Sequence, residues 1–386
     1  MATEKGVWDI QDARDKSLQS LWIYSAPVQL WMVGGDNGYG AYGLNDQVSR
    51  SSPIQVPGTN WDGDNIRYIG DHSLLRKTDG TLWTMGSASW GTLGLNDENT
   101  NYSSPIQIPG TTWSSLPTID AGTISAALKS DGTLWVWGRN VRGVMGQNQA
   151  YSPSTKGRSS PTQIPGTTWS SASAAPSQIN AIKTDGTLWT WGQNHKGQLG
   201  LNSRTYYSSP VQLPGTWTKT IVTSYRASFG WKSDTELWSW GYGSNGTLGQ
   251  NNTTQYSSPV QITGDWPSGV GKFSAFYKNA SAVKSDGTLW MWGANDYGQL
   301  GQNNRTQYSS PKQVGSDTTW SQVASGNYQT LATKTDNTLW TWGLNNYGQL
   351  GLNNKTQYSS PVQVPGTIWS GPVNAGANVS SVFAQL

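Results

Sequence analysis

The sequence predicts an all-β protein built from repeats that close into one toroidal domain. A phrase that is best formed at 338–343, Thr-Leu-Trp-Thr-Trp-Gly, occurs seven times at spacings of 49 to 54 residues, which is the range of propeller and solenoid repeats. Turn signals divide each repeat into four short strands, and the two ends of the chain carry complementary halves of one repeat. The first Trp of the phrase falls at Trp31, Trp83, Trp135, Trp189, Trp238, Trp290 and Trp340.

The composition agrees with many short strands joined by tight turns. The 386 residues include 46 Gly and 23 Trp, and only 12% are charged. Seven of the tryptophans occupy the first position of the phrase, five the position two residues later, and seven the start of the next repeat. Because these positions are periodic, we expect most of the tryptophan to belong to the core, with the Trp pair of the phrase in the blade interior.

Charge and cysteine content exclude several classes of function. The formal net charge is +3, from 25 Lys and Arg against 22 Asp and Glu without long runs, which gives no electrostatic case for nucleic acid or membrane binding. The absence of cysteine excludes disulfides, thiolate metal sites and thiol catalysis. No signal peptide or apolar stretch of membrane-spanning length is present, so we expect no membrane insertion and, outside a virion, a soluble cytoplasmic protein.

The sixth repeat shows how we expect each unit to be built. Strands are predicted at 272–276, 280–284, 288–292 and 312–314. Asp286-Gly287 is expected to form a type I′ turn between the second and third strands, since both central positions of that turn need positive φ. The fifth repeat has Asp234-Thr235 instead, and its turn should differ because Thr tolerates positive φ poorly.

The fourth strand of each repeat is expected at the outer edge of its blade. In the sixth repeat the glycines of 297–301, Tyr-Gly-Gln-Leu-Gly, allow a compact chain reversal before a polar loop. Pro311 then begins the fourth strand, where proline suits a first residue or an edge because it cannot donate to a ladder.

The ends of the chain predict how the ring closes. The first repeat has third and fourth strands near 28–32 and 53–56, whereas the last repeat is followed by first and second strands near 375–376 and 379–384. A composite blade joining them would leave no unpaired edge. Residues 1–24 do not fit the repeat, so we expect an N-terminal appendage at 1–24 and a toroidal domain at 25–386.

The repeated string resembles the regulator-of-chromosome-condensation repeat family. Lys-Ser/Thr-Asp-Gly-Thr-Leu-Trp-x-Trp-Gly-x-Asn-x-x-Gly-Gln-Leu-Gly is complete at 183–200 and 284–301, and the match extends over about residues 25–386. The resemblance implies a seven-bladed β-propeller with four-stranded blades, in a phage or bacterial member of the family. Propellers similar to this serve as nucleotide-exchange factors, enzyme inhibitors and interaction platforms, so the fold does not decide the function.

The last residue of each polar loop is a candidate for partner binding. In a propeller these equivalent positions form a rim on one side of the ring, and Tyr and Arg suit such a surface because each combines apolar area with a polar tip. The alternative is that each Tyr packs on its neighbour and fixes its loop. The candidate binding rim consists of Arg50, Tyr102, Arg158, Tyr207, Tyr256, Tyr308 and Tyr358.

The residues give no pattern for catalysis, cofactor binding or a metal site. His72 and His195 lie at different repeat positions, and no nucleophile accompanies either; we expect a structural role for His72 and an exposed His195. Asp79 and its equivalents lack calcium-loop spacing and are interpreted as turn residues. We therefore predict no enzyme activity and no cofactor.

The appendage gives the one hint of biological context. Residues 6–12, with apolar Val7, Trp8 and Ile10, resemble short segments on structural proteins of tailed phages, and they are the candidate anchor. The leading hypothesis is a virion decoration, fibre or tail component that binds other virion proteins through 1–24 and displays loops for a host-surface protein or glycan. The alternative is a soluble inhibitor or regulatory partner of an enzyme. A guanine-nucleotide exchange factor is disfavoured, because residues 1–20 carry a net charge of −1 rather than a basic tail.

Overall fold

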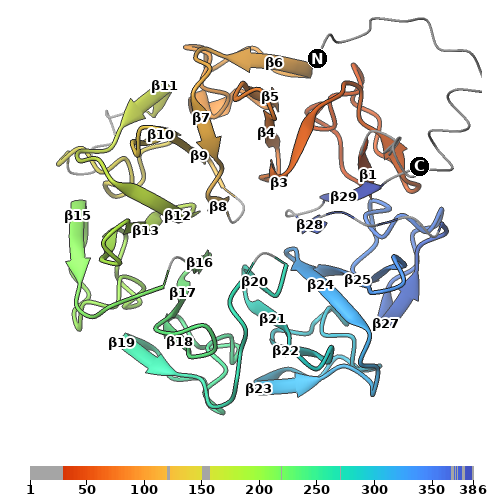
Figure 1. Ribbon diagram of the computed structural model, residues 1–386. Coiled ribbons are helices and arrows are strands. Elements are labelled where there is room, and N and C mark those ends of the chain that lie inside the picture. The colour runs from red at the N-terminus through yellow and green to blue at the C-terminus, as the bar shows by residue number, and fades with distance from the viewer. Residues whose placement is uncertain are drawn as a thin grey trace, which may run out of the picture.

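The protein folds as an all-β propeller (Figure 1). The computed structural model describes residues 29–386 except 120–121, 150–156, 219, 270, 367–368, 370, 372, 376–378 and 385–386. The described residues form sheets arranged around a central axis, and the strands of each sheet run from the axis outwards (Figure 1). The predicted candidate anchor lies outside the described residues.

The first three sheets contain the following strands. The first has β28 (Val373–Ala375), β29 (Val379–Ala384), β1 (Gln29–Gly35) and β2 (Ile54–Gln55), from the axis outwards. The second has β3 (Trp61–Tyr68), β4 (His72–Lys77), β5 (Leu82–Gly86) and β6 (Tyr102–Ile108), with the 3-10 turn η1 (Ser89–Gly91) before β6. The third has β7 (Trp113–Ser115), β9 (Ile124–Lys129), β10 (Leu134–Gly138) and β11 (Arg158–Gln163).

The remaining sheets follow the same order. The fourth has β8 (Thr118–Ile119), β12 (Trp169–Ala175), β13 (Gln178–Lys183), β14 (Leu188–Gly192) and β15 (Tyr207–Leu213). The fifth has β16 (Ile221–Ser224), β17 (Ala227–Trp231), β18 (Leu237–Gly241) and β19 (Tyr256–Gln261). The sixth has β20 (Phe273–Phe276), β21 (Asn279–Val283), β22 (Leu289–Gly293) and β23 (Tyr308–Gln313). The seventh has β24 (Trp320–Ser325), β25 (Gln329–Lys334), β26 (Leu339–Gly343) and β27 (Tyr358–Gln363).

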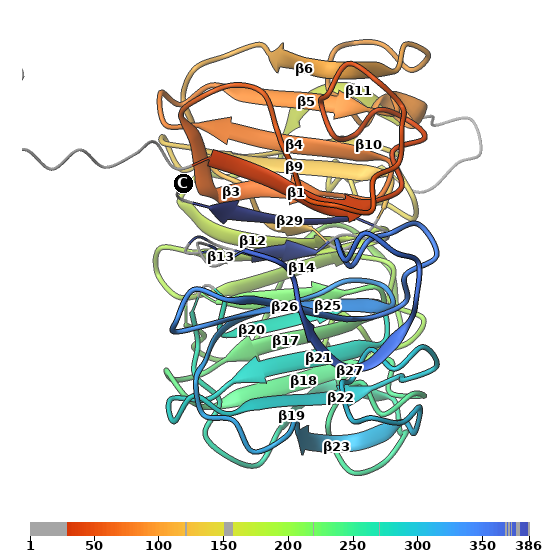
Figure 2. The same cartoon turned by 90° about the vertical axis from the view of Figure 1, so that its right-hand side faces the viewer.

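The composite sheet predicted from the chain ends is confirmed. β1 and β29 lie side by side (Figure 2) and pair in antiparallel register, with Trp31 opposite Val382. β28 completes the inner side of this sheet (Figure 1). The seventh sheet also docks on the first, because the backbone N–H of Asn353 donates to the carbonyl of Ser51 at 2.6 Å. Sheet pairing and loop docking therefore both join the two ends of the array.

The expectation of uniform four-stranded blades is wrong at one position. Six sheets in the described residues have four strands, whereas the fourth sheet has five because β8 adds to β12 in parallel, with Thr118 opposite Ser173. In the third sheet the innermost strand stops at Ser115, just before Pro117. Proline cannot donate a ladder hydrogen bond, so the chain leaves β9 there and continues along the neighbouring sheet.

The Asp-Gly hairpins do not form the predicted type I′ turns. Gly80 has φ of 83°, but Asp79 is not among the residues with positive φ, and the Gly80 N–H donates to the Lys77 carbonyl at 3.0 Å. This is a type I turn followed by a left-handed glycine. Asp79 instead accepts from the backbone N–H and the hydroxyl of Thr81, and that hydroxyl accepts from Trp83 Nε1. The role of these aspartates as turn residues is confirmed.

The hairpin of the fifth repeat differs, as expected from its Asp234-Thr235. No Asp-Thr-Trp relay is present there, and the N–H of Glu236 donates to Ser233 Oγ at 3.2 Å. In the seventh repeat Asn337 adopts φ of 64° and occupies the place of the glycine. Asn is among the few residues that tolerate this region, which explains why that hairpin keeps the relay through Asp336 and Thr338.

The second Trp, which five of the seven phrases carry, forms the contact between neighbouring sheets. Trp342 is fully buried, and its Nε1 donates to the Gln299 carbonyl of the preceding repeat at 2.8 Å. The indole lies over Gly301, where an added Cβ would come within 2.9 Å of Nε1. The same donation to the preceding repeat is made by Trp137, Trp191, Trp240 and Trp292.

The first Trp of each phrase is only half-buried, so the prediction that both members of the pair lie inside the blade is wrong for it. Trp340 lies at the hairpin side of its sheet, and Lys334 Nζ sits 4.2 Å from its ring centroid and 4.9 Å from that of Trp320. Such cation-π contacts let a lysine stem cover apolar surface while its charge stays near water. The arrangement recurs at the lysines Lys77, Lys129, Lys183, Lys232 and Lys284.

We expect Gly301→Ala to destabilise the ring by roughly 2–4 kcal/mol, because it combines a left-handed backbone with a clash against Trp342. Gly315→Ala is the matched control, since Gly315 also has a left-handed φ of 60° but no atom lies within 4 Å of an added Cβ. Its cost should be roughly 1–2 kcal/mol. Urea unfolding of both variants measures the difference, and equal losses would show that the indole-glycine contact adds nothing.

Candidate functional site

The turns and loops that join the strands emerge on two opposite sides of the ring. Gly86 at the end of β5 pairs with both His72, which begins β4, and Tyr102, which begins β6. The turn between the first two strands and the loop between the last two therefore emerge on the same side, which we call the loop face. The Asp-Gly hairpins emerge on the opposite side, the hairpin face.

Each long loop is held by the next repeat through one asparagine. Asn303 adopts φ of 55°, its backbone N–H donates to the Ser359 carbonyl at 2.8 Å, and its Oδ1 accepts from Ser360 Oγ at 3.2 Å. The left-handed conformation is one that Asn tolerates. The same backbone contact is made by Asn45, Asn96, Asn148, Asn202, Asn251 and Asn353. The loop face is thus fixed to the ring at equivalent points.

The candidate binding rim lies at equivalent positions on the loop face. Each rim residue is opposite the glycine that ends the third strand, as Tyr308 is opposite Gly293. Its tyrosines are half-buried, and the hydroxyls of Tyr256 and Tyr308 accept from Asn252 and Asn304 at 3.1 and 3.3 Å. These contacts agree with the loop-fixing role that the sequence left open for the tyrosines.

The two arginines of the rim have different surroundings. Arg50 is bound within its own loop, because Nη2 lies 2.7 Å from Asp46 Oδ2 and Nη1 donates to the Val48 carbonyl. Arg158 is exposed and donates to Gln149 Oε1 at 3.2 Å. Of this pair, Arg158 is therefore the one with a guanidinium open to a partner. The rim as a binding surface stays a prediction.

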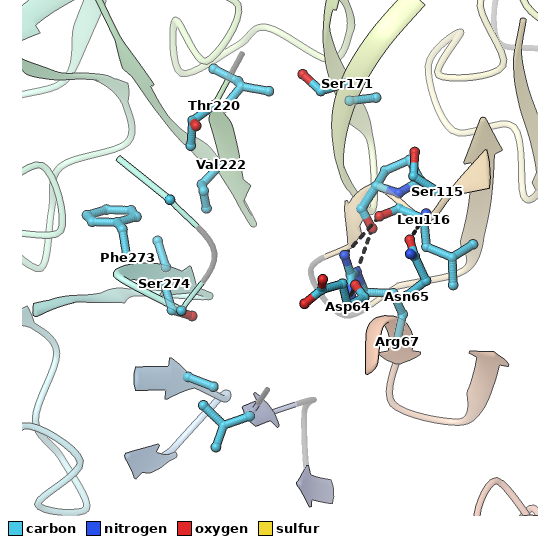
Figure 3. Close-up of a pocket in the computed structure, with 18 of the residues that line it drawn as sticks. Asp64, Asn65, Arg67, Ser115, Leu116, Ser171, Thr220, Val222, Phe273 and Ser274 are labelled. Atoms are coloured by element: carbon cyan, nitrogen blue, oxygen red, sulfur yellow. Dashed lines mark hydrogen bonds between the residues drawn. The ribbon is translucent and has the colours of Figure 1, made fainter. Parts of the chain in front are cut away.

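The axis of the ring holds a cavity of about 460 Å³, lined by the innermost strands (Figure 3). Its wall combines apolar side chains such as Val222 and Phe273 with hydroxyls such as Ser171 and Ser274. Periodicity alone did not single out these residues, because the innermost strands differ more between repeats than the Trp phrase does.

Arg67 joins the second and third sheets at this cavity. Its Nε and Nη2 donate to the carbonyls of Pro117 and Leu116 at 2.8 Å, and Nη1 donates to Asp64 and Ile66 carbonyls (Figure 3). Although part of the side chain remains accessible, burial lowers the pKa of Arg67 to about 10, so it stays protonated at neutral pH. Its donors are used to hold the interrupted strand, which makes it a structural residue rather than an anion site.

The two histidines have the following surroundings. His72 is buried, its Nε2 lies 2.8 Å from Ser125 Oγ, and burial lowers its pKa to about 3, in agreement with a structural role. The expectation that His195 is exposed is wrong: it is half-buried, its Nδ1 lies 2.6 Å from Gln193 Nε2, and its ring centroid lies 6.5 Å from that of Tyr206. Tight packing of the long loop explains the difference.

Two features are absent from the residues that the structure describes. No group of three or more His, Cys, Asp or Glu residues there could hold a metal ion. In the same part of the chain, no helix has the length and apolar character of a membrane span.

A ring of Trp-phrase repeats with loops fixed to one face defines a repeat propeller. The chain belongs to the RCC1-like domain family, whose sequence pattern matches residues 119–385. It is 27% identical to the ultraviolet-B receptor UVR8 of Arabidopsis thaliana over 315 residues, which cover 78% of this chain and 69% of that protein. It is 29% identical to the human X-linked retinitis pigmentosa GTPase regulator over 120 residues, 31% of this chain but 12% of that protein.

A solved structure shares the fold over nearly the whole chain. Prp20p of Saccharomyces cerevisiae superposes with a TM-score of 0.79 over 95% of this chain and 93% of its own, at 17% identity. At that identity the likeness shows the fold alone.

We expect the free energy of unfolding of the His72→Gln variant to depend less on pH than that of the wild type. Unfolded His72 titrates near 6.5 but folded His72 only at about 3, so between these pH values the unfolded state binds a proton that the folded state does not. Stability should therefore fall as pH decreases from 6.5 towards 3. At about pH 4.5 the wild type should have lost about 2–3 kcal/mol more than the variant, relative to neutral pH. Urea unfolding at both pH values measures this, and parallel losses would contradict a buried neutral histidine.

Proposed function

We propose that this chain is a non-enzymatic propeller that binds a protein partner through its loop face. The observation that carries the proposal is the asparagine contact that fixes each long loop on the next repeat. A scaffold that holds loop backbones at equivalent points, while their side chains differ, suits recognition rather than packing.

The known proteins support a binding role without specifying a partner. The solved Prp20p structure is described together with binding to Gsp1p and histones. We propose only the general property for this chain, because fold-level similarity does not transfer a partner. We further propose that the five-stranded fourth sheet acts as one blade beside the six four-stranded ones, so that the ring has seven blades.

The rim and the hairpin face give a direct test. Arg158→Glu changes an exposed rim residue, whereas Thr216→Glu places the same side chain on the hairpin face, where Thr216 Cγ2 lies near Gly186. We expect Arg158→Glu to weaken partner capture by about tenfold. Thr216→Glu should leave it unchanged. Affinity capture from the native source with quantitative mass spectrometry measures both, and loss only with Thr216→Glu would assign binding to the other face.

We also propose that the chain is a virion component attached by residues 1–24. The proposal rests on Val7, Trp8 and Ile10 of the candidate anchor. Deleting residues 1–24 should leave the circular dichroism and unfolding of the ring unchanged while abolishing its incorporation into particles. A triple Ala variant of the three apolar residues is the matched control for length. Full incorporation of the truncated protein would show that the appendage is not the anchor. Tight one-to-one capture of a soluble enzyme would instead favour the inhibitor alternative.

A further inference from the structure

Pairs of cationic and aromatic side chains lie along the loop face from the second to the fifth sheet. The Arg139 guanidinium lies 4.4 Å from the ring centroid of Trp90, which belongs to the preceding repeat. Arg142 lies 5.3 Å from the ring of Tyr206 and donates to its hydroxyl at 2.9 Å. We call this series the cation-aromatic arc, and it consists of Trp90, Arg139, Arg142, His195, Lys196, Tyr206, Tyr225, Arg226 and Tyr242.

The contacts within the arc connect successive sheets. Lys196, after β14, lies 5.4 Å from the ring of Tyr242, after β18. Arg226 lies 4.6 Å from the ring of Tyr225, in the turn between β16 and β17. Tyr225 in turn packs at 5.3 Å on Tyr277 of the sixth sheet. Each ring contact favours one placement of its cation, so the arc holds its charges beside aromatic rings.

Positive charge is concentrated in one sector of the loop face. The described loop-face segments of the third to fifth sheets contain no Asp or Glu, and their cations are Arg139, Arg142, Arg158, Lys196, Arg204 and Arg226. The corresponding segments of the first two sheets contain the carboxylates Asp36, Asp46, Asp71, Asp97 and Glu98. The net charge of the whole chain, +3, conceals this separation.

The surroundings of His195 show that the cations converge. Burial lowers its pKa to about 4, and the charges of Arg226, Lys196, Arg142 and Arg204 act in the same direction. Trp90 and Tyr206 are 40% and 43% exposed, so the arc is open to solvent rather than sealed inside the ring.

We propose that the cation-aromatic arc binds a carboxylate-rich segment of a partner protein. The planar guanidinium groups of Arg142 and Arg226 match carboxylate geometry and can each donate two hydrogen bonds. Arg, Tyr and Trp are also the residues that dominate binding energy at protein interfaces. The inference rests on the proposed function, because it assigns the partner's chemistry at the loop face.

Nucleic acid fits the arc less well than an acidic polypeptide. Single-stranded nucleic acid binds by stacking its bases on open aromatic faces. In the arc, cations already cover faces of Trp90, Tyr206, Tyr225 and Tyr242. A carboxylate needs no open ring face, because it can reach the guanidinium and ammonium groups from the side.

The test compares two double variants of equal net charge in the full chain. Arg142→Glu with Arg226→Glu reverses the arc, whereas Lys312→Glu with Lys355→Glu reverses exposed lysines of the sixth and seventh repeats. The probe is a fluorescein-labelled oligoglutamate peptide, read by anisotropy at low and high salt. We expect the wild type and the lysine variant to bind it similarly and the arginine variant to bind about tenfold or more weakly. Unfolding curves check that both variants are folded.

Several outcomes would overturn the proposal. The wild type could fail to bind oligoglutamate, or both double variants could weaken binding equally, which would reduce the effect to net charge. A labelled oligodeoxythymidine that binds more tightly than oligoglutamate, and depends on the same arginines, would assign the arc to nucleic acid. Self-association lost in the arginine variant, measured by light scattering, would assign it to a second copy. If any of these results appears while Arg158→Glu still weakens partner capture, the inference fails and the proposed function stands. If Arg158→Glu leaves capture unaffected as well, both fail.

Discussion

The structure depends on the contact between an indole and the repeat before it. Trp342 donates to the Gln299 carbonyl, and its ring lies over Gly301. The hydrogen bond and this close packing together fix how one sheet is placed on the next. A glycine is required because any Cβ would displace the ring. At the two repeats without this Trp, Met85 and Val33 occupy the space over Gly43 and Gly351. At these two contacts, side-chain packing on glycine takes the place of the indole hydrogen bond. The pairing of β1 with β29 also holds the two ends of the chain together.

Much of this architecture could be predicted because it is encoded by periodic residues. The Trp phrase gave the repeat, and the complementary ends gave the composite sheet. The hairpin type could not be predicted from Asp-Gly alone, because that dipeptide suits either a type I′ turn or a type I turn with a left-handed glycine. The Thr81 hydroxyl, which bridges Asp79 and Trp83, accompanies the second geometry. The interruption of the third sheet near Pro117 could not be predicted either, because the carbonyls of this segment are held by Arg67 of the neighbouring sheet.

The candidate site was only partly accessible to the same reasoning. The rim tyrosines could be identified from the sequence because they recur at equivalent positions. Tyr256 and Tyr308 accept hydrogen bonds from loop asparagines, so a recurring residue can also serve packing within its loop. The cation-aromatic arc could not be identified from the sequence, because its members occupy different positions in their repeats. Arg139 follows a third strand, Tyr206 precedes a fourth, and Arg226 sits in a turn between first and second strands. Only folding places them on one face.

Recurring and non-recurring residues therefore have different roles in a repeat protein: the first build the scaffold and the second can recognise a partner. Residues that recur from repeat to repeat serve the contacts that the repeats share, so their side chains are committed to neighbours, as the indole of Trp342 is. A partner meets the ring in one orientation and needs a surface without the repeat symmetry. In the described residues, the loop-face segments of the third to fifth sheets carry cations without carboxylates, whereas those of the first two sheets carry five carboxylates. This difference in charge makes the loop face asymmetric around the ring. Long-range steering by these opposed sectors would then orient an acidic partner before contact, with a rate that falls as salt is added.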